Sequence, residues 1–212
     1  MLAAMAASKS ASGLVSGLRA LWAAHGGRYL FAVFCYHHVL KGFVLAYVFT
    51  SFDFVMQSYH VPGPRMQLLK TAATLPWALK PLLGLLSDAC PVTGLHKAPY
   101  IAAASVLGTC AFGIVAWYGL SLRLEAMVLA FTMISVQVAT CDLLTEAATA
   151  ERLRMQPSLG PTLMSFVTGG ITVGEIVAIA TVGRVLERLG PCGPCALCLV
   201  PSALMLVPTA AD

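Results

Sequence analysis

The amino-acid sequence predicts an all-α integral membrane protein built as a bundle of six helices. Hydrophobic residues make up 58% of the 212 residues and charged residues only 10%, whereas an ordinary soluble domain is about 25% charged. The mean hydropathy is +0.83. Burying so much apolar surface in water would need a much larger polar shell than this chain can supply. The length accommodates roughly six transmembrane helices of about 20 residues each, joined by short loops.

Six apolar stretches bounded by charges, proline or glycine mark the predicted spans. Helices are expected because the bilayer core offers no water to satisfy an open backbone. The spans cover residues 29–50, 65–86, 99–120, 125–144, 161–183 and 191–208. Residues 29–208 then form one transmembrane domain, and residues 1–28 are either a cytosolic tail or a weak targeting segment. The weak bias of basic residues between loops places both termini in the cytosol.

Charged residues inside four of the six predicted spans, together with Glu146 just after the fourth, are the candidate functional residues. Such side chains are costly at mid-bilayer and usually face a cavity or a partner. The candidates for solute binding or coupling are Lys41, Lys80, Asp142, Glu146 and Glu175. Glu175 needs a proton or a cationic partner, and Lys41 and Lys80 are the candidates for that partner. The third and sixth spans carry no charge, which favours a lipid-facing or structural role for both.

The four-residue spacing of Asp142 and Glu146 places both carboxylates on one helix face. Two interpretations are equally open: a proton-binding pair, or an anchor at the membrane edge that pairs with Arg152 or Arg154. In the first span, His37 and His38 point about 100° apart on a helix. At most one of them therefore faces the same site, and the other is expected to pack against a neighbouring helix.

The stretch from Pro76 to Asp88, PWALKPLLGLLSD, is the most specific string in the chain. Pro76 and Pro81 predict a kinked second helix, because proline removes a backbone hydrogen bond. Gly84 allows a neighbour to approach closely. In the fifth span, Gly170 and Gly174 have the GxxxG spacing that permits close helix packing.

This string resembles the folate–biopterin transporter family of the major facilitator superfamily. Gly84 to Asp88 also looks like the start of the general facilitator loop motif, in which the aspartate works with basic loop residues. Here His96 and Lys97 are the candidates for that role. The resemblance implies that Gly84, Asp88 and Lys97 form a gating element.

Two further segments extend the resemblance over about residues 29–208. Lys41-Gly42 is similar to the family's Lys-Gly pair, and Asp142 to Glu146 is similar to its fourth-helix acidic segment. Family members carry about twelve helices, built as two halves around a site at the membrane midplane. The resemblance therefore implies the N-terminal half of a major facilitator transporter.

The implied function is membrane transport of a folate or pterin by alternating access, with proton coupling left open. Lys41 or Lys80 would meet the solute's carboxylates, and Asp142 would bind a pterin edge or carry a proton. The implied partners are the lipid bilayer, the solute, and a second six-helix half or a second copy of the chain. The alternatives are a facilitator of another small organic solute and a truncated membrane protein that does not transport.

Other functional classes find no support in the residues. The basic residues are scattered, so no nucleic-acid partner is expected. Cys192, Cys195 and Cys198 have CxxC-like spacing but open an apolar segment, which favours small residues at a helix start. The chain has no paired-histidine metal motif, phosphate loop or nucleophile motif. We therefore expect no metal, no cofactor and no enzymatic activity.

Overall fold

The computed structural model describes residues 15–91 and 97–209, and every regular element in these ranges is a helix. Residues 15–25 are helical and precede the first labelled element. The elements that follow are α2 (Gly27–Val33), η1 (Phe34–Val44), α3 (Leu45–Ser58), α4 (Gly63–Ala73), α5 (Leu75–Ala78), α6 (Lys80–Ala89), α7 (Ala98–Tyr118), η2 (Gly119–Ser121), α8 (Leu124–Met155), η3 (Pro157–Leu159), α9 (Gly160–Leu189), α10 (Gly193–Leu204) and α11 (Leu206–Thr209).

Among the described residues, four continuous helices are long and apolar enough to cross a membrane. They cover Gly27–Ser58, Ala98–Ser121, Leu124–Met155 and Pro157–Leu189. The predicted second and sixth spans are also helical, but each is divided into shorter pieces, α4–α6 and α10–α11. The all-helical membrane fold is therefore confirmed, and the count of six spans is not.

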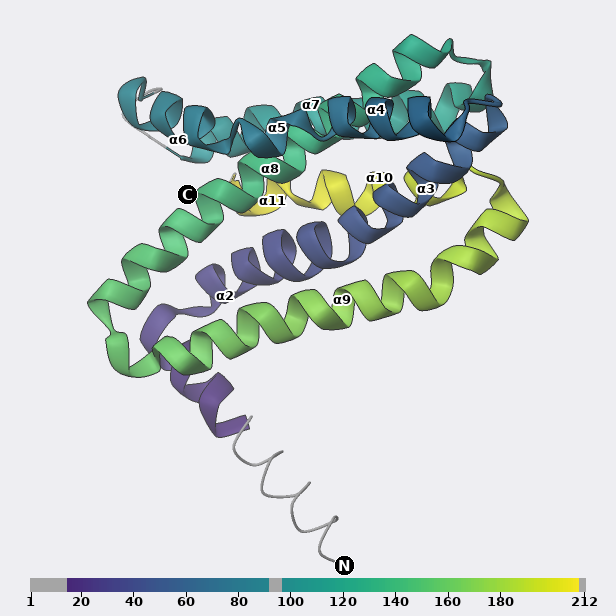
Figure 1. The fold of residues 1–212 in the computed structure, drawn as a ribbon. Coiled ribbons are helices and arrows are strands. Elements are labelled where there is room, and N and C mark those ends of the chain that lie inside the picture. The colour runs from purple at the N-terminus through teal and green to yellow at the C-terminus, as the bar shows by residue number, and fades with distance from the viewer. Residues whose placement is uncertain (1–14, 92–96, 210–212) are drawn as a thin grey trace, which may run out of the picture.

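Proline explains the division of the second predicted span. Pro76 and Pro81 lie in the first turns of α5 and α6. The residues before these helices, Thr74 and Leu79, leave helical geometry, with φ/ψ of −94°/3° and −88°/3°. Proline has no N–H to donate and clashes with the preceding turn, so the helical hydrogen bonding stops. The three pieces still run in line along one side of the molecule (Figure 1).

Two helices extend well beyond their predicted ends. We expected the fourth span to end at Leu144, but α8 continues to Met155. The charges that suggested an end do not stop the helix, because Glu146 and Glu151 form ion pairs with lysines from other segments. Likewise, α9 continues past residue 183 to Leu189, where Gly190 adopts the positive φ of 73° that favours glycine.

The core lies around α8, which packs against α7, against η1 and against the α4–α6 segment. Phe131 of α8 and Phe52 of α3 meet edge to face with ring centroids 5.1 Å apart. Phe112, Met127 and Ile134 are fully buried in the same cluster. Helix α8 is thus the element on which the charged residues of the neighbouring helices converge.

Helix α9 lies alongside the α2–η1–α3 helix (Figure 1) and contacts it through glycine. A Cβ at Gly174 would lie 2.5 Å from the backbone oxygen of His38 and 3.2 Å from Cα of Gly42. A Cβ at Gly170 would collide with the His38 ring. Gly170 and Gly174 therefore permit a backbone approach that any side chain would prevent.

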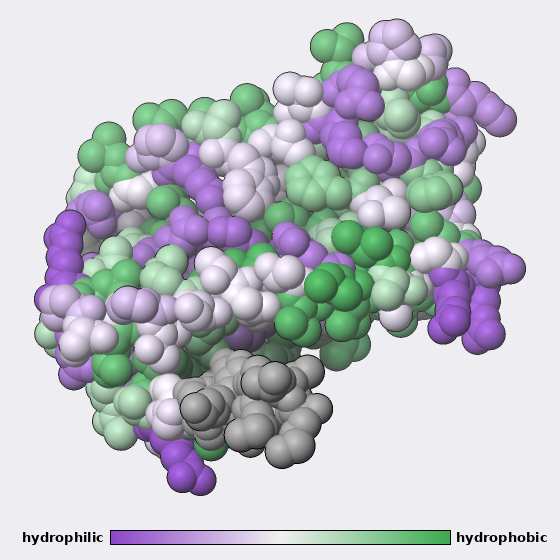
Figure 2. Space-filling model, turned by 60° about the horizontal axis from the view of Figure 1, so that its bottom comes forward, coloured by the Kyte–Doolittle hydropathy of each residue, from purple (hydrophilic) through white to green (hydrophobic). Residues whose placement is uncertain are grey.

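The opposite side of α9 is apolar and exposed. Val173, Ile176 and Ile179 are each at least 60% exposed. The face seen in Figure 2 carries many hydrophobic residues, with strongly hydrophilic residues both at its margins and across its middle. An apolar exposed flank of this kind suits contact with lipid.

Candidate functional site

Three helices bring two lysines onto one buried carboxylate. Lys41 Nζ of η1 lies 2.7 Å from Asp142 Oδ1, and Lys80 Nζ of α6 lies 2.5 Å from Asp142 Oδ2. Lys41 Nζ also donates to Glu146 Oε1 at 2.8 Å. The side chain of Asp142 is 1% exposed. Because a buried carboxylate is costly without partners, the lysines explain how Asp142 is accommodated. We call Lys41, Lys80, Asp142 and Glu146 the ion-pair cluster.

Local backbone geometry positions both lysines. Lys80 is the first residue of α6, directly after the interruption at Leu79, and its ammonium lies 4.2 Å from the ring centroid of Trp77. Lys41 lies in η1, an eleven-residue π-helical stretch inside the first long helix. Such wide turns are rare and are frequently found at functional sites. The helix breaks at Pro76 and Pro81 thus direct Lys80 to α8, and the π-helix directs Lys41 to it.

The two adjacent histidines separate as their spacing predicts. His37 Nδ1 lies 3.9 Å from Asp142 Oδ1, so this ring faces the ion-pair cluster. His38 turns to α9, where its Nε2 is 3.0 Å from the carbonyl oxygen of Phe166. The His37 side chain is 1% exposed, yet neither ring nitrogen has a hydrogen-bond partner among the described residues. His37 is therefore the residue of this site that the sequence left undecided.

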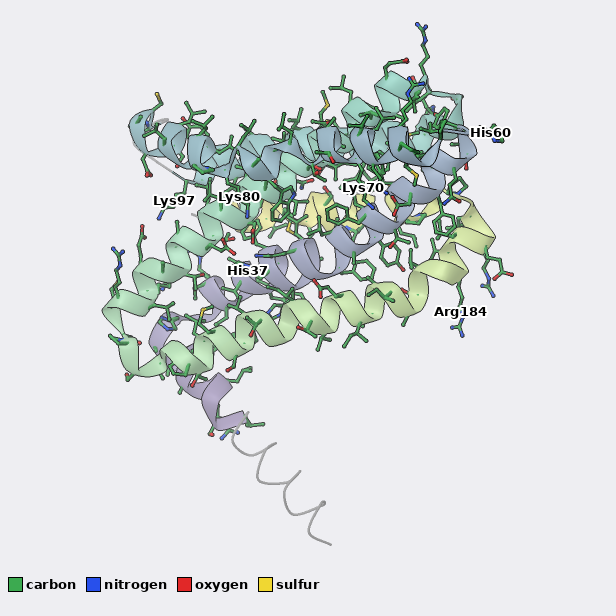
Figure 3. All side chains as sticks on the ribbon, viewed as in Figure 1. His37, His60, Lys70, Lys80, Lys97 and Arg184 are labelled. Atoms are coloured by element: carbon green, nitrogen blue, oxygen red, sulfur yellow. The ribbon has the colours of Figure 1, made fainter. Side chains whose placement is uncertain are left out.

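The formal charges of the cluster balance, with two ammonium groups and two carboxylates. Its two ends differ in access: Glu146 is 51% exposed and Lys41 is 24% exposed, while Asp142 is buried. Lys80 and His37 lie at the level where α8 passes between α6 and η1 (Figure 3). The Glu146 end of the cluster is therefore its more accessible end.

Glu175 does not join this arrangement. It lies exposed on α9, and both lysines expected as its partners are bound to α8 carboxylates instead. The expected pairing of Glu175 with Lys41 or Lys80 is therefore wrong. Periodicity along α9 alone does not show which face of the helix is covered by its neighbours.

The expected anchor contacts also differ. Asp142 and Glu146 bind Lys41, while the Arg152 guanidinium lies 3.9 Å from the centroid of the Tyr29 ring. Lys97 forms its ion pair with Glu151 of α8, within the part of the chain that the structure describes, and not with Asp88. Asp88 and Gly84 lie on α6, and Gly84 faces Leu143 of α8. His96 lies outside the described residues.

Sequence reasoning missed two further polar contacts inside the helices. Lys70 of α4 donates to both carboxylate oxygens of Asp53 on α3, each at 2.8 Å. Gln137 of α8 accepts from Ser202 of α10 at 2.9 Å, and Ser202 is 3.0 Å from Thr109 of α7. The intramembrane position of Gln137 was the available signal for the second contact. Among the described residues, no group of three or more His, Cys, Asp or Glu side chains is placed to hold a metal.

Comparison with known proteins identifies relatives for most of the chain. "Probable folate-biopterin transporter 2" of Arabidopsis thaliana is 29% identical over 141 residues, covering 66% of this chain and 28% of its own length. "Probable folate-biopterin transporter 5" of the same plant is 26% identical over 181 residues, 84% of this chain and 37% of its own. The "Folate-biopterin transporter" of Synechocystis sp. is 32% identical over 114 residues, 53% of this chain and 22% of its own.

These matches leave most of each relative uncovered, so the chain spans roughly a fifth to two fifths of the proteins it resembles. No solved structure matches the chain significantly. The model of the BT1 family matches residues 41–210. This match includes Lys41 and every other member of the ion-pair cluster. The helical membrane fold agrees with it, and the chain belongs to the BT1 family.

Proposed function

We propose that this chain forms the N-terminal half of a twelve-helix carrier that moves folate or pterin-type solutes across a membrane by alternating access. The names of the relatives support this solute class. In this proposal α4–α6 and α10–α11 serve as the second and sixth spans, and residues 29–208 form the transmembrane domain. Its activity is transport, and no catalytic chemistry is involved.

The observation that carries the proposal is the pair of lysines from two helices that share the buried Asp142. Folates carry carboxylates, and Lys41 and Lys80 offer cations for them. When a solute carboxylate takes the Lys41 ammonium, the buried Asp142 keeps Lys80, and only the half-exposed Glu146 loses its partner. The solute thereby changes the contacts that hold η1 and α6 to α8, which is the kind of differential interaction a conformational change requires.

We assign Glu146 the outer position, where it holds Lys41 until the solute arrives. Its greater exposure and its single bond to Lys41 support this order. Asp142 is the inner carboxylate and the candidate for contact with the pterin edge. Glu175, exposed on α9, is retained only as a candidate for contact with a second half of the carrier.

Proton coupling in this proposal uses His37. A proton on its Nδ1 would convert the 3.9 Å contact with Asp142 into an ion pair and weaken the hold of Asp142 on the lysines. The titratable groups around His37 are Asp142 and Glu146 of α8, Lys41 and His38 of η1, and Lys80 of α6.

The gate and the orientation are also proposals. Gly84 lies in the middle of α6 and Asp88 near its end, and the bond between Lys97 and Glu151 ties the start of α7 to the last turns of α8. We propose that this end lies in the cytosol, with both termini. The exposed apolar flank of α9 contacts lipid, a second six-helix half or a second copy of the chain.

The test uses cells that express this chain joined to the C-terminal part of probable folate-biopterin transporter 5 of Arabidopsis thaliana. Uptake of labelled folate and of labelled biopterin is measured. Lys41→Met and Lys80→Met should each abolish uptake of folate, whose carboxylates they would bind. Lys70→Met is the matched control, because Lys70 is also a paired intramembrane lysine but binds Asp53 outside the cluster. Unchanged uptake in the Lys41 and Lys80 variants would contradict the proposal.

The solute and the proton are tested separately in the same cells. A panel of organic anions and amino acids replaces folate, and transport of one of these without folate would assign a different solute. His37→Gln should flatten the pH dependence of uptake, while His38→Gln, whose ring faces α9, should retain it. Equal pH profiles for the two variants would exclude the coupling role of His37.

A further inference from the structure

A second polar region extends from the border of the ion-pair cluster to one end of the bundle. It surrounds a cavity of about 540 Å³, a volume within the usual range of ligand sites. Residues from the segment before α2, from α2, α7 and α8, and from α11 line it. The basic lining residues are His25, Arg28, Lys97 and Arg152, and no described lining residue is a carboxylate.

Hydrogen bonds and ring contacts hold the polar wall of this cavity in place. The Arg152 guanidinium stacks on the Tyr29 ring at 3.9 Å, and the Tyr29 hydroxyl donates to Thr149 Oγ1 at 3.0 Å. His25 meets the same ring edge to face, with centroids 5.6 Å apart. The His25 Nε2 atom is buried and has no hydrogen-bond partner among the described residues.

Within the described residues, Arg152 has no carboxylate at ion-pair distance, so its charge is available to an anion. Lys97 is bound to Glu151, which does not itself line the cavity. Burial and, to a smaller extent, the Arg152 charge lower the pKa of His25, so this ring is neutral at pH 7 and acts as a hydrogen-bonding group. Arg152 offers a planar set of donors of the kind that binds phosphate oxygens in pairs.

The lining changes from polar to apolar in the same direction along three helices. On α2, Arg28 and Tyr29 precede Phe31, Ala32 and Val33. On α7, Lys97 precedes Ile101. On α8, which runs the opposite way, Leu144 and Ala148 alternate with Thr145 and Thr149, and Arg152 comes last. The lining therefore places the cations at the helix ends and most of the hydrocarbon farther in.

We propose that this cavity binds the phosphate group of an anionic ligand, and that the ligand is a phospholipid whose acyl chains follow the apolar wall. Basic pockets between transmembrane helices commonly bind anionic headgroups. The bias of basic residues toward one side of a membrane explains why arginines occur at these helix ends. That bias alone does not explain why one arginine stacks on a tyrosine ring in the wall of a cavity that also has an apolar lining. The inner end of this cavity, at Leu144 and Thr145, borders the ion-pair cluster, and its basic residues lie at the other end.

The experiment uses the full chain purified in detergent. Native mass spectrometry and thermal unfolding are followed with phosphatidylglycerol, with phosphatidylcholine of the same acyl chains, and with inorganic phosphate alone. The wild type should retain phosphatidylglycerol in preference to phosphatidylcholine. Arg152→Gln should weaken that binding about tenfold or more, because a charge-assisted contact is lost, and adding Arg28→Gln should weaken it further.

Arg184→Gln is the matched control, because Arg184 is an exposed arginine on α9 at the other end of the bundle from Lys97 (Figure 3). Should the double variant fail to fold, Arg152→Lys provides the second measurement, with an intermediate loss of binding expected. A response to inorganic phosphate without preference between the lipids supports the anion site and assigns it a soluble ligand. No response to either anion, or equal losses in Arg152→Gln and Arg184→Gln, would overturn the site.

Discussion

Helices α8 and α9 are nearly identical in length and hydropathy, yet they have opposite places in the molecule. Their most apolar 18-residue windows have mean hydropathies of 1.8 and 1.7. In α8, 67% of that window is buried inside the protein, and in α9 only 17%. Each helix also carries an acidic residue well inside its length, Asp142 in α8 and Glu175 in α9.

This difference teaches that hydropathy shows that a helix lies in an apolar environment, but not whether lipid or other helices surround it. Lipid tails are as apolar as a protein core, so an apolar helix gains no hydrophobic free energy by exchanging one for the other. What distinguishes α8 is that polar groups from three other helices reach it: Lys41, Lys80 and Ser202. Helix α9 instead meets its neighbour through glycine and leaves its other flank open.

The sharpest test of this comparison removes one acid from each helix. Asp142→Asn leaves Lys80 without its carboxylate and should lower the free energy of unfolding by about 3–5 kcal/mol, as for a broken buried ion pair. Glu175→Gln should change it by less than about 0.5 kcal/mol, because the residue is exposed. Unfolding in mixed micelles with a denaturing detergent measures both. Equal losses would show that burial does not separate the two acids.

The glycines of α9 divide its covered face from its open face. Gly174→Ala inserts a methyl group 2.5 Å from the His38 carbonyl oxygen and should destabilise the protein by about 1–3 kcal/mol. Gly169→Ala meets nothing within 4 Å and should be neutral, or more stable by about 0.5–1 kcal/mol through helix propensity. The same unfolding assay compares them. A destabilising Gly169→Ala would mean that this flank is also covered.

Hydrogen bonding between helices should distinguish α8 from α9 more weakly. Gln137→Leu removes the acceptor for Ser202 and should cost about 1 kcal/mol. Thr172→Val on α9 removes only a bond to the Thr168 carbonyl oxygen in the same helix and should change stability by less than about 0.5 kcal/mol. Thermal unfolding in detergent provides the measurement. An equal loss from Thr172→Val would contradict a purely internal bond.

The smallest effect is expected where the charges of α8 reach solvent. Glu151 is 64% exposed, so Glu151→Gln should lower the free energy of unfolding by about 0–1 kcal/mol, and salt should reduce the effect further. Because the bond to Lys97 joins the start of α7 to α8, its loss should alter uptake by the joined carrier more than it alters stability. A large loss of stability at high salt would indicate that this pair is buried in the membrane.

The residues themselves contained much of the fold and of the candidate site. Composition identified a helical membrane protein, and Pro76 and Pro81 indicated the breaks in the second predicted span. Lys41, Lys80, Asp142 and Glu146 were all candidates because a charge inside an apolar run is costly wherever it lies. The full extent of α8 was not predicted, because Glu146 and Glu151 are paired with lysines that are distant in the sequence.

The sequence by itself determined that the protein lies in a membrane, that its fold is helical, and which charged residues are candidates for the site. Apolar content, proline and charge act locally, so each can be read without the tertiary structure. Only the tertiary structure decided which charges meet. Lys80 and Asp142 are 62 residues apart, and Lys41 and Glu146 are 105 apart. Helical periodicity states which residues share a face, but not which helix covers that face. Packing therefore joined the lysines to α8, left Glu175 exposed on α9, and gathered Arg28 and Arg152 around one cavity.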